Sequence, residues 1–321
     1  MNMKATRKAY GEALAKLGNK YPNVVSLDAE TKNSTYAEDF KAVYPHRYFD
    51  CFIAEQNMVG MAVGMAHMGK IPFASSFAAF FTRAYDQVRM GALSLANFKI
   101  VGSHAGVSIG PDGSSQMALE DLACMRAVWN SVVLYPSDPV ATEKLVEEMI
   151  KHKGFCYMRT TRAATETVYT ETEQFPIGGF KIHRANKQIV PRSGISLRET
   201  NSKSITIISA GITFHEALKV QKKVAGEIDV TVIDLYSVKP INVTELKRTV
   251  ATEHVVTVED HWFEGGLGDA VLNVFSDVPS VSVHKLAVST LPHSGSPEEN
   301  LARAGIDAEA IEKKVNEILS M

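Results

Sequence analysis

Cysteine is scarce in this sequence, with three residues in a chain of 321. Cys51, Cys124 and Cys156 are odd in number, far apart and surrounded by apolar residues. This spacing argues against a disulfide framework or a cysteine metal site, and we expect reduced thiols in the core. Reduced thiols are typical of the cytoplasm, which is therefore the expected compartment.

The sequence also lacks an apolar run long enough to cross a bilayer and a block of basic residues. A membrane-spanning helix needs about 20 predominantly apolar residues, and we recognise no secretory leader. The formal net charge is -2, so we expect neither nucleic acid nor a membrane as a partner. The content of 45% hydrophobic and 22% charged residues is ordinary for a globular protein, and the length predicts two domains.

Short, continuous apolar runs recur along the chain and alternate with helix-like segments. Strands are expected at 24–27, 48–53, 71–77, 99–102, 132–135 and 156–159, and again at 205–208, 230–235, 255–258 and 281–286. Such runs are typical of parallel strands with helices on both faces. The sequence therefore predicts an α/β protein with two open, mostly parallel sheets, whose ligands would bind beyond the carboxyl ends of the strands.

The periodicity fails between the two sets of strands. Residues 166–203 are polar and basic, contain prolines and glycines, and are predicted to form a linker with an irregular hairpin. The first domain is then expected at 1–165 and the second at 204–321. Residues 185–201 make the connection longer than is usual, and we expect a surface loop there.

The most informative stretch runs from Phe52 to Arg89. Glu55 is expected in the first turn of a helix, and small residues separate four methionines on one face of that helix. These are Met58, Met61, Met65 and Met68. We expect the methionines to be core residues, although the small residues between them would also suit a close interface. A second helix is predicted to open with an aromatic cluster, Phe77, Phe80 and Phe81.

An acid and an aromatic cluster at two successive strand-to-helix junctions suggest a site for a flat, nitrogen-containing ring. Core packing is the alternative, and we favour it for Phe81. The strings IAEQNM and SFAAFFTRAYDQVRM resemble the pyrimidine-binding domain of transketolase, a thiamine diphosphate enzyme. Further similar strings follow in the family order: ATRKAYG, TKNST, GSHAGVSIGPDGSSQMALED, YPSD, VATEK, MRTTR and VEDHWFEGGLG. Together they cover nearly the whole chain.

The resemblance implies that this chain builds part of a thiamine diphosphate site. Glu55 matches the glutamate that hydrogen-bonds the aminopyrimidine ring, which lets the coenzyme lose its C2 proton. A carboxyl group in an apolar pocket suits this task because burial favours its protonated form. The alternative is a helix N-terminal acid stabilised by the helix dipole. Phe77 and Phe80 match the aromatic residues that pack on the aminopyrimidine.

A glycine-rich loop, residues 102–113, follows the strand at 99–102. No lysine stands where a nucleotide-phosphate loop requires one. By resemblance, His104 and Asp112 face the sugar hydroxyls, and Gln116 stands where family members carry His or Gln. We therefore expect His104 and Gln116 to act in catalysis beside Glu55.

Three residues far apart in the sequence resemble those that hold the sugar phosphate in transketolase: Arg7, Ser34 and Arg162. The planar guanidinium group of arginine binds phosphate oxygens in pairs. Taken singly, each residue could equally belong to a surface ion pair. Taken together, they imply phosphorylated sugars as substrates. Glu30 stands where the family usually has Asp near the thiazolium, and we expect it to contact the coenzyme.

The chain has no Gly-Asp-Gly stretch followed by an asparagine, the hard-oxygen motif that holds Mg²⁺ and the diphosphate in these enzymes. We therefore expect no metal ligands here and an N-terminal, diphosphate-binding partner chain that carries Mg²⁺. The resemblance implies the C-terminal subunit of a split transketolase, inactive alone and paired with its partner as α2β2. It would transfer a two-carbon ketol unit from a ketose phosphate to an aldose.

Three alternatives share parts of this pattern. The β chain of a 2-oxoacid dehydrogenase has a similar plan, but it would not need the phosphate-binding set of Arg7, Ser34 and Arg162. Deoxyxylulose phosphate synthase shares the architecture, although the SFAAFFTRAYDQ and SHAGVSIGPDG strings are closer to transketolase. A binding or regulatory subunit without activity is the third, and the presence of Glu55 with its aromatic neighbours counts against it.

Overall fold

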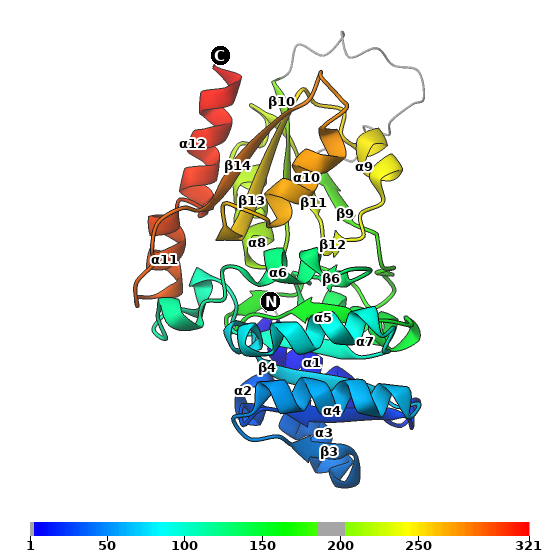
Figure 1. Cartoon of the computed structure of the whole chain (residues 1–321). Helices are drawn as coiled ribbons and strands as arrows, with labels where there is room; N and C mark the ends of the chain where they lie inside the picture. The colour runs from blue at the N-terminus through cyan, green and yellow to red at the C-terminus, as the bar shows by residue number, and fades with distance from the viewer. Residues whose placement is uncertain (1–2, 185–202, 321) are drawn as a thin grey trace.

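The structure, a computed structural model, describes residues 3–184 and 203–320 of the chain (Figure 1). The described part holds two mostly parallel sheets with helices on their faces, which confirms the predicted α/β class. The predicted insertion at 185–201 lies outside the described residues. None of the helices in the described ranges is long and apolar enough to cross a membrane.

The first sheet has seven strands in the order β12-β6-β7-β5-β4-β2-β3. Neighbouring strands run parallel, except that β12 runs antiparallel to β6. In this order the strands are Ser237–Lys239, Val132–Leu134, Cys156–Arg159, Lys99–Ser103, Ile71–Phe77, Val24–Asp28 and Tyr48–Asp50. The six parallel strands lie where the apolar runs predicted them, with β3 ending at Asp50 rather than at Ile53.

The second sheet has five strands in the order β14-β13-β10-β11-β9, of which only the edge strand β9 is antiparallel to its neighbour. They are Ser282–Val288, His254–Trp262, Ser204–Ser209, Asp229–Asp234 and Lys181–Arg184. A separate two-stranded sheet pairs β1 with β8, Met3–Ala5 with Ala164–Glu166.

One strand crosses the boundary that the sequence suggested between the halves, and another forms within the predicted linker. Strand β12 comes from the second half of the chain but pairs with β6 in the first sheet. Strand β9 comes from the segment predicted as a linker but pairs with β11 in the second sheet. The two halves are therefore tied by main-chain hydrogen bonds as well as by side-chain packing.

Helices cover both faces of each sheet (Figure 1). Around the first sheet, α1 contacts both α3 and α7 on one face, and α4 contacts α5 on the other. The helices of the first half are α1 Thr6–Leu17, α2 Lys32–Thr35, α3 Ala37–Val43, α4 Glu55–His67, α5 Tyr85–Leu93, α6 Asp121–Ala127 and α7 Pro139–Lys151. Those of the second half are α8 Ile212–Lys223, α9 Val243–Thr249, α10 Leu267–Phe275, α11 Pro297–Ala304 and α12 Ala308–Leu319.

Local sequence explains where several helices begin. Helix α7 starts after Asp138, whose carboxylate accepts a hydrogen bond from the main-chain N–H of Ala141, and proline fills the next position. Helix α11 starts with a capping box between Ser296 and Glu299 and ends at Gly305, which has φ 68°. These caps satisfy main-chain groups that the first and last helical turns leave unpaired.

Two local predictions from the Phe52–Arg89 stretch are wrong. The methionines of α4 are not all core residues: Met58 is buried, whereas Met61 and Met68 are 40% and 82% exposed. The helix expected to open at Phe77 begins later, because Phe77 ends β4 and residues 78–84 form a 3-10 helix before α5. Phe81 is fully buried, as predicted.

Candidate active site

The predicted site residues gather at the carboxyl edge of the first sheet. Strands β7, β5, β4 and β2 are neighbours in this sheet and run parallel, so their carboxyl ends meet at one edge. Phe77 ends β4, His104 directly follows β5, and Arg162 lies shortly after β7. The shared edge is the reason why residues far apart in the sequence come together.

Glu55 lies at the start of α4 and is 3% exposed. Its Oε1 accepts a hydrogen bond from Nη1 of Arg83 at 2.8 Å, and the two side chains form an ion pair. The guanidinium carbon of Arg83 lies 4.7 Å from the ring centroid of Phe80. The sequence did not single out Arg83, although it belongs to the string that carries the resemblance.

The aromatic side chains form a continuous stack from the 3-10 helix at residues 78–84 to the glycine-rich loop. The rings of Phe77 and Phe80 lie 5.2 Å apart with an interplanar angle of 4°. The imidazole of His104 lies 3.9 Å from the ring of Phe77, with an angle of 9°. Stacked rings hold one another at a fixed tilt. The site thus has a flat aromatic wall, with Arg83 and Glu55 at one end and His104 at the other.

His104 is 3% exposed and adopts φ 61°, an unusual backbone conformation for a residue other than glycine. Its Nδ1 lies 2.8 Å from Oγ of Ser103. Burial, together with the positive charges of Arg7 and Arg162, lowers the pKa of His104 to about 3. The imidazole is therefore neutral at physiological pH and can both donate and accept a hydrogen bond.

Positive charge is concentrated next to His104. Nη1 of Arg7 donates to the main-chain oxygen of Ser34 at 2.7 Å, and Nη1 of Arg162 donates to Oδ1 of Asp112 at 2.8 Å. Burial lowers the pKa of Arg7, and the nearby charge of Arg162 lowers it as well. Two partly buried cations held so close together need an anion to balance them. Asp112 supplies part of that balance, and an anionic ligand would supply the rest.

Buried hydroxyl groups keep the two arginines together. Thr6 precedes Arg7, and Thr161 precedes Arg162; their Oγ1 atoms lie 3.2 Å apart. The main-chain N–H of Thr161 also donates to Oγ1 of Thr6 at 2.9 Å. The start of α1 and the end of β7 are thereby joined, so the spacing of Arg7 and Arg162 is set by the main chain.

Asp28, at the end of β2, is a further buried residue that the sequence did not single out. Its carboxylate accepts hydrogen bonds from the main chain of Thr31 and from Oγ1 of Thr35 at 2.7 Å. Burial raises the pKa of Asp28 more than these hydrogen bonds lower it, and the result is a pKa of about 6. Asp28 thereby shapes the turn that presents Ser34 to Arg7. An aspartate at a strand end, followed by threonine at the third position, was the available signal for this turn.

Two predicted residues lie apart from these contacts. Glu30 has φ 63° and an exposed side chain, with Oε1 3.8 Å from Nζ of Lys32. Gln116 ends a short 3-10 helix beyond the glycine-rich loop and is partly exposed. Their roles in coenzyme binding and catalysis stay predictions. Within residues 3–184 and 203–320, no group of three or more His, Cys, Asp or Glu side chains is arranged to hold a metal ion.

An apolar surface borders Glu55 on the outside of the molecule. Phe52 and Ile53, just before α4, are 69% and 78% exposed, and Met61 and Met68 continue this surface along the helix. A side chain added at Gly60 or Gly64 would meet no atom within 4 Å. We call the set Phe52, Ile53, Gly60, Met61, Gly64 and Met68 the α4 surface. A cluster of exposed apolar side chains beside small residues is typical of a surface that another chain covers.

Comparison with family models matches residues 2–167 to the pyrimidine binding domain of transketolase and residues 195–311 to its C-terminal domain. The chain belongs to the transketolase family. Human transketolase is 46% identical over 320 residues, which cover 98% of this chain and 49% of that protein. The mouse transketolase-like protein 2 is 48% identical over 314 residues, with 97% and 48% coverage. The chain thus spans about half the length of these transketolase relatives.

Solved structures agree with this assignment. A structure described as "Split gene transketolase, inactive beta4 tetramer" has a TM-score of 0.86 and 34% identity, and the match covers 98% of both chains. The transketolase of Leishmania mexicana has a TM-score of 0.80 at 20% identity; it matches this whole chain over 46% of its own length, which shows a shared fold. This chain therefore shares its architecture with one solved chain of similar length and with part of a longer transketolase.

Proposed function

We propose that this chain is the C-terminal subunit of a two-chain transketolase, which transfers a two-carbon ketol unit from a ketose phosphate to an aldose acceptor. The observation that carries the proposal is the continuity of the site. The aromatic wall runs from Glu55 and Arg83 to His104, and the paired cations Arg7 and Arg162 lie directly beyond His104. A ring-binding end and a phosphate-binding end are thus joined by one neutral, hydrogen-bonding imidazole.

The residues present fit the aminopyrimidine half of thiamine diphosphate. Glu55 offers a buried carboxyl group whose partner, Arg83, is 53% exposed. Phe77 and Phe80, both partly exposed, offer an apolar aromatic wall for the coenzyme ring, and the stacking of Phe77 between Phe80 and His104 holds that wall in place. When bound, the coenzyme would supply the nucleophilic carbon and the electron sink for ketol transfer. In this proposal Glu55 shares a proton with the ring nitrogen, Phe77 and Phe80 set the tilt of the ring, and Glu30 contacts the thiazolium side.

The other residues act on the sugar. His104, kept neutral by burial, can hydrogen-bond a sugar hydroxyl while donating or accepting a proton, and Gln116 assists from the neighbouring segment. Arg7 and Arg162 bind the phosphate group with their N–H donors, and the main chain of Ser34 orients Arg7. Asp112 holds Arg162 in place and faces the sugar hydroxyls. Remote binding of the phosphate then helps to position the reacting carbon.

A partner chain completes the proposal. The α4 surface lies beside Glu55, so a chain that covers it would reach the coenzyme as well. We propose that this partner carries the Mg²⁺-diphosphate site and that two copies of each chain assemble as α2β2, since closed symmetry is the rule for oligomers. The similar split-gene structure is described as an inactive tetramer of one chain type, which supports the need for a partner. The three free cysteines suit the cytoplasmic location proposed from the sequence.

The test compares this chain, the diphosphate-binding chain from the same genome, and their mixture, each with thiamine diphosphate and Mg²⁺. We expect ketol transfer from the mixture alone, and light scattering of the mixture should give the mass of two copies of each chain. Full activity of this chain by itself would refute the split arrangement. A stable complex that binds thiamine diphosphate yet transfers no ketol unit from any ketose phosphate would refute the reaction.

A further inference from the structure

The glycine-rich loop of the first domain is held by a carboxylate from the second sheet. Asp260 lies within β13 and is fully buried. Its Oδ1 accepts a hydrogen bond from the main-chain N–H of Val107 at 2.7 Å, and its Oδ2 accepts one from Ser108 at 3.5 Å. A single side chain thus binds two successive peptide groups of a loop that precedes it by about half the chain.

The loop is shaped to receive this carboxylate. Gly106 adopts φ 92°, a conformation that other residues rarely adopt, and a Cβ atom there would lie 2.0 Å from Oδ2 of Asp260. Gly106 is therefore required for two reasons, its backbone conformation and the close approach of Asp260. The direction in which the chain leaves His104 depends on this contact, because Gly106 follows His104 by two residues.

A second residue, from another element of the second half of the chain, holds the same loop. Asn300, in α11, is buried and donates from Nδ2 to the main-chain oxygen of Val107 at 3.3 Å. Further along, Cβ atoms at Gly110 and Gly113 would lie 3.2 Å from the main-chain oxygen of Gly295 and 2.9 Å from Oγ of Ser294. The loop therefore runs closely along α11 and the segment before it (Figure 1).

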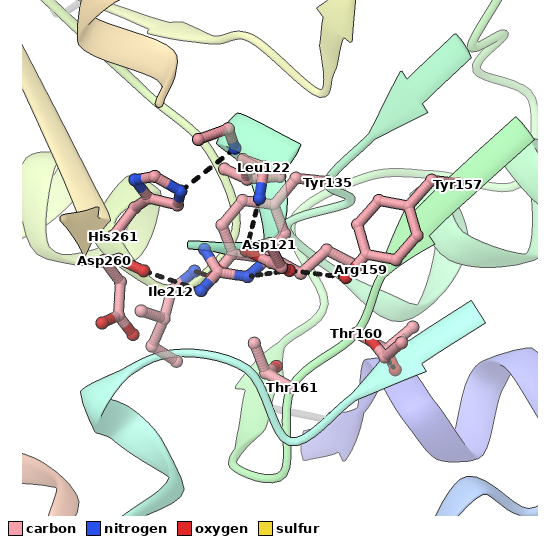
Figure 2. A network of polar contacts seen from close by, with 12 residues as sticks. Asp121, Leu122, Tyr135, Tyr157, Arg159, Thr160, Thr161, Ile212, Asp260 and His261 are labelled. Atoms are coloured by element: carbon pink, nitrogen blue, oxygen red, sulfur yellow. Dashed lines mark hydrogen bonds and ion pairs between the residues drawn. The ribbon is translucent and has the colours of Figure 1, made fainter. Parts of the chain in front are cut away.

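Arg159 lies next to Asp260 in the core (Figure 2). Nη2 of Arg159, which is fully buried, donates to the main-chain oxygen of Asp260 at 2.8 Å, and its Nε lies 3.2 Å from Oδ2 of Asp121. Burial raises the pKa of Asp260, and the positive charge of Arg159 acts in the opposite direction. Figure 2 shows the Asp260 carboxylate pointing away from the guanidinium group, which leaves both carboxylate oxygens for the loop.

We propose that Asp260 and Asn300 are positioning residues, through which the second half of the chain sets the geometry of the substrate-binding loop. The inference rests on the proposed function only in naming the loop's ligand, a phosphorylated sugar. The two ends of the loop carry the residues concerned: His104 stacks on Phe77, and Asp112 holds Arg162. Neither positioning residue needs to touch the substrate. They determine whether His104 and Asp112 face it together.

The first test measures amide hydrogen exchange of the chain alone. Asp260→Asn keeps the side-chain shape and leaves Arg159 paired with Asp121, but it turns one acceptor into an N–H donor that faces a main-chain N–H. We expect peptides that cover 104–113 to exchange about tenfold faster, since hydrogen bonds to a buried charged group are lost. Asn300→Ala should have a smaller effect on the same peptides. Asp277→Asn, which removes an exposed aspartate of the same half of the chain, is the matched control and should change nothing.

The second test uses the assembled enzyme with a ketose phosphate and an aldose phosphate. In both loop variants we expect KM for the sugars to rise about tenfold with a smaller fall in kcat, and the affinity for thiamine diphosphate to stay unchanged. If Asp260→Asn speeds exchange throughout the second sheet, the role of Asp260 is structural. The exchange of peptides 104–113 in Asn300→Ala then decides whether the second half of the chain positions the loop. Unchanged exchange of 104–113 in both variants would overturn the inference. An inactive wild-type assembly would refute the proposed function, and the exchange result would still decide the role of Asp260.

Discussion

Arg162→Ala tests the most specific part of the proposed site, the recognition of a phosphate group. Arg162 donates to Asp112 at 2.8 Å and to the main-chain oxygen of Ile109 at 3.3 Å, and its side chain is 38% exposed. Both contacts orient the guanidinium group and leave other N–H donors for a ligand. Because the pair with Asp112 is partly exposed, its loss should lower the free energy of unfolding by less than about 1 kcal/mol.

The effect on catalysis should be larger. A hydrogen bond to a charged group contributes about 1.5–3 kcal/mol, which corresponds to roughly tenfold to more than a hundredfold in kcat/KM. Arg7 stays in place beside the phosphate, so we expect a loss near the lower end of this range. The loss should be confined to phosphorylated sugars. Hydroxypyruvate with glycolaldehyde has no phosphate group and should react at nearly the wild-type rate.

The assay measures kcat and KM for both substrate pairs with one preparation of the assembled enzyme. Arg248→Ala is the matched control, because Arg248 is 72% exposed on α9 and pairs only with Glu245 among the contacts described for it. Arg248→Ala should leave kcat and KM unchanged for both substrate pairs. Equal losses on both pairs with Arg162→Ala would refute the reasoning, since they would show that Arg162 serves the fold or the contact with the partner chain.

Two further predictions concern Glu55 and His104. Glu55→Gln keeps the side-chain shape, so circular dichroism should stay unchanged. In the assembled enzyme the variant should abolish ketol transfer and slow exchange of the coenzyme C2 proton. Normal C2 exchange would remove Glu55 from the mechanism. The pKa of His104 is lowered from 6.5 to about 3, so the unfolded chain binds a proton that the folded chain does not, and stability is lost as the pH falls below about 6.5. The free energy of unfolding, measured with urea, should therefore fall between about pH 6 and pH 4 more steeply for the wild type than for His104→Asn. The difference in slope should be up to about 1.4 kcal/mol per pH unit. Equal slopes would show that His104 takes up its proton in the folded chain as readily as in the unfolded chain.

Much of the site could be predicted from the sequence because the strands are parallel. Apolar runs mark the strands, and in a parallel sheet the residue after each run must lie at one edge, whatever the details of packing. Phe77, His104 and Arg162 were placed at that edge by this rule. In the structure His104 stacks on Phe77, and the charge of Arg162 acts on His104. The fold class follows from the same pattern of strands and helices.

Contacts between distant segments could not be predicted in this way. No local signal pairs Arg83 with Glu55, and periodicity cannot show that Met68 is exposed while Met58 is buried on the same face. The turn held by Asp28 and the exposure of Glu30 depend on how β2 meets its neighbours. Side-chain pairing of this kind is decided by packing, which depends on the whole chain rather than on nearby residues.

The sequence by itself determined the two parallel sheets, the edge at which ligands bind, and the chemical character of the residues along that edge. Only the tertiary structure decided how the two halves cooperate. Strand β12 joins the first sheet, and Asp260 reaches the peptide groups of Val107 and Ser108. The physical reason is that a buried carboxylate and a buried main-chain N–H each require a partner, and the fold alone determines which partner lies within reach.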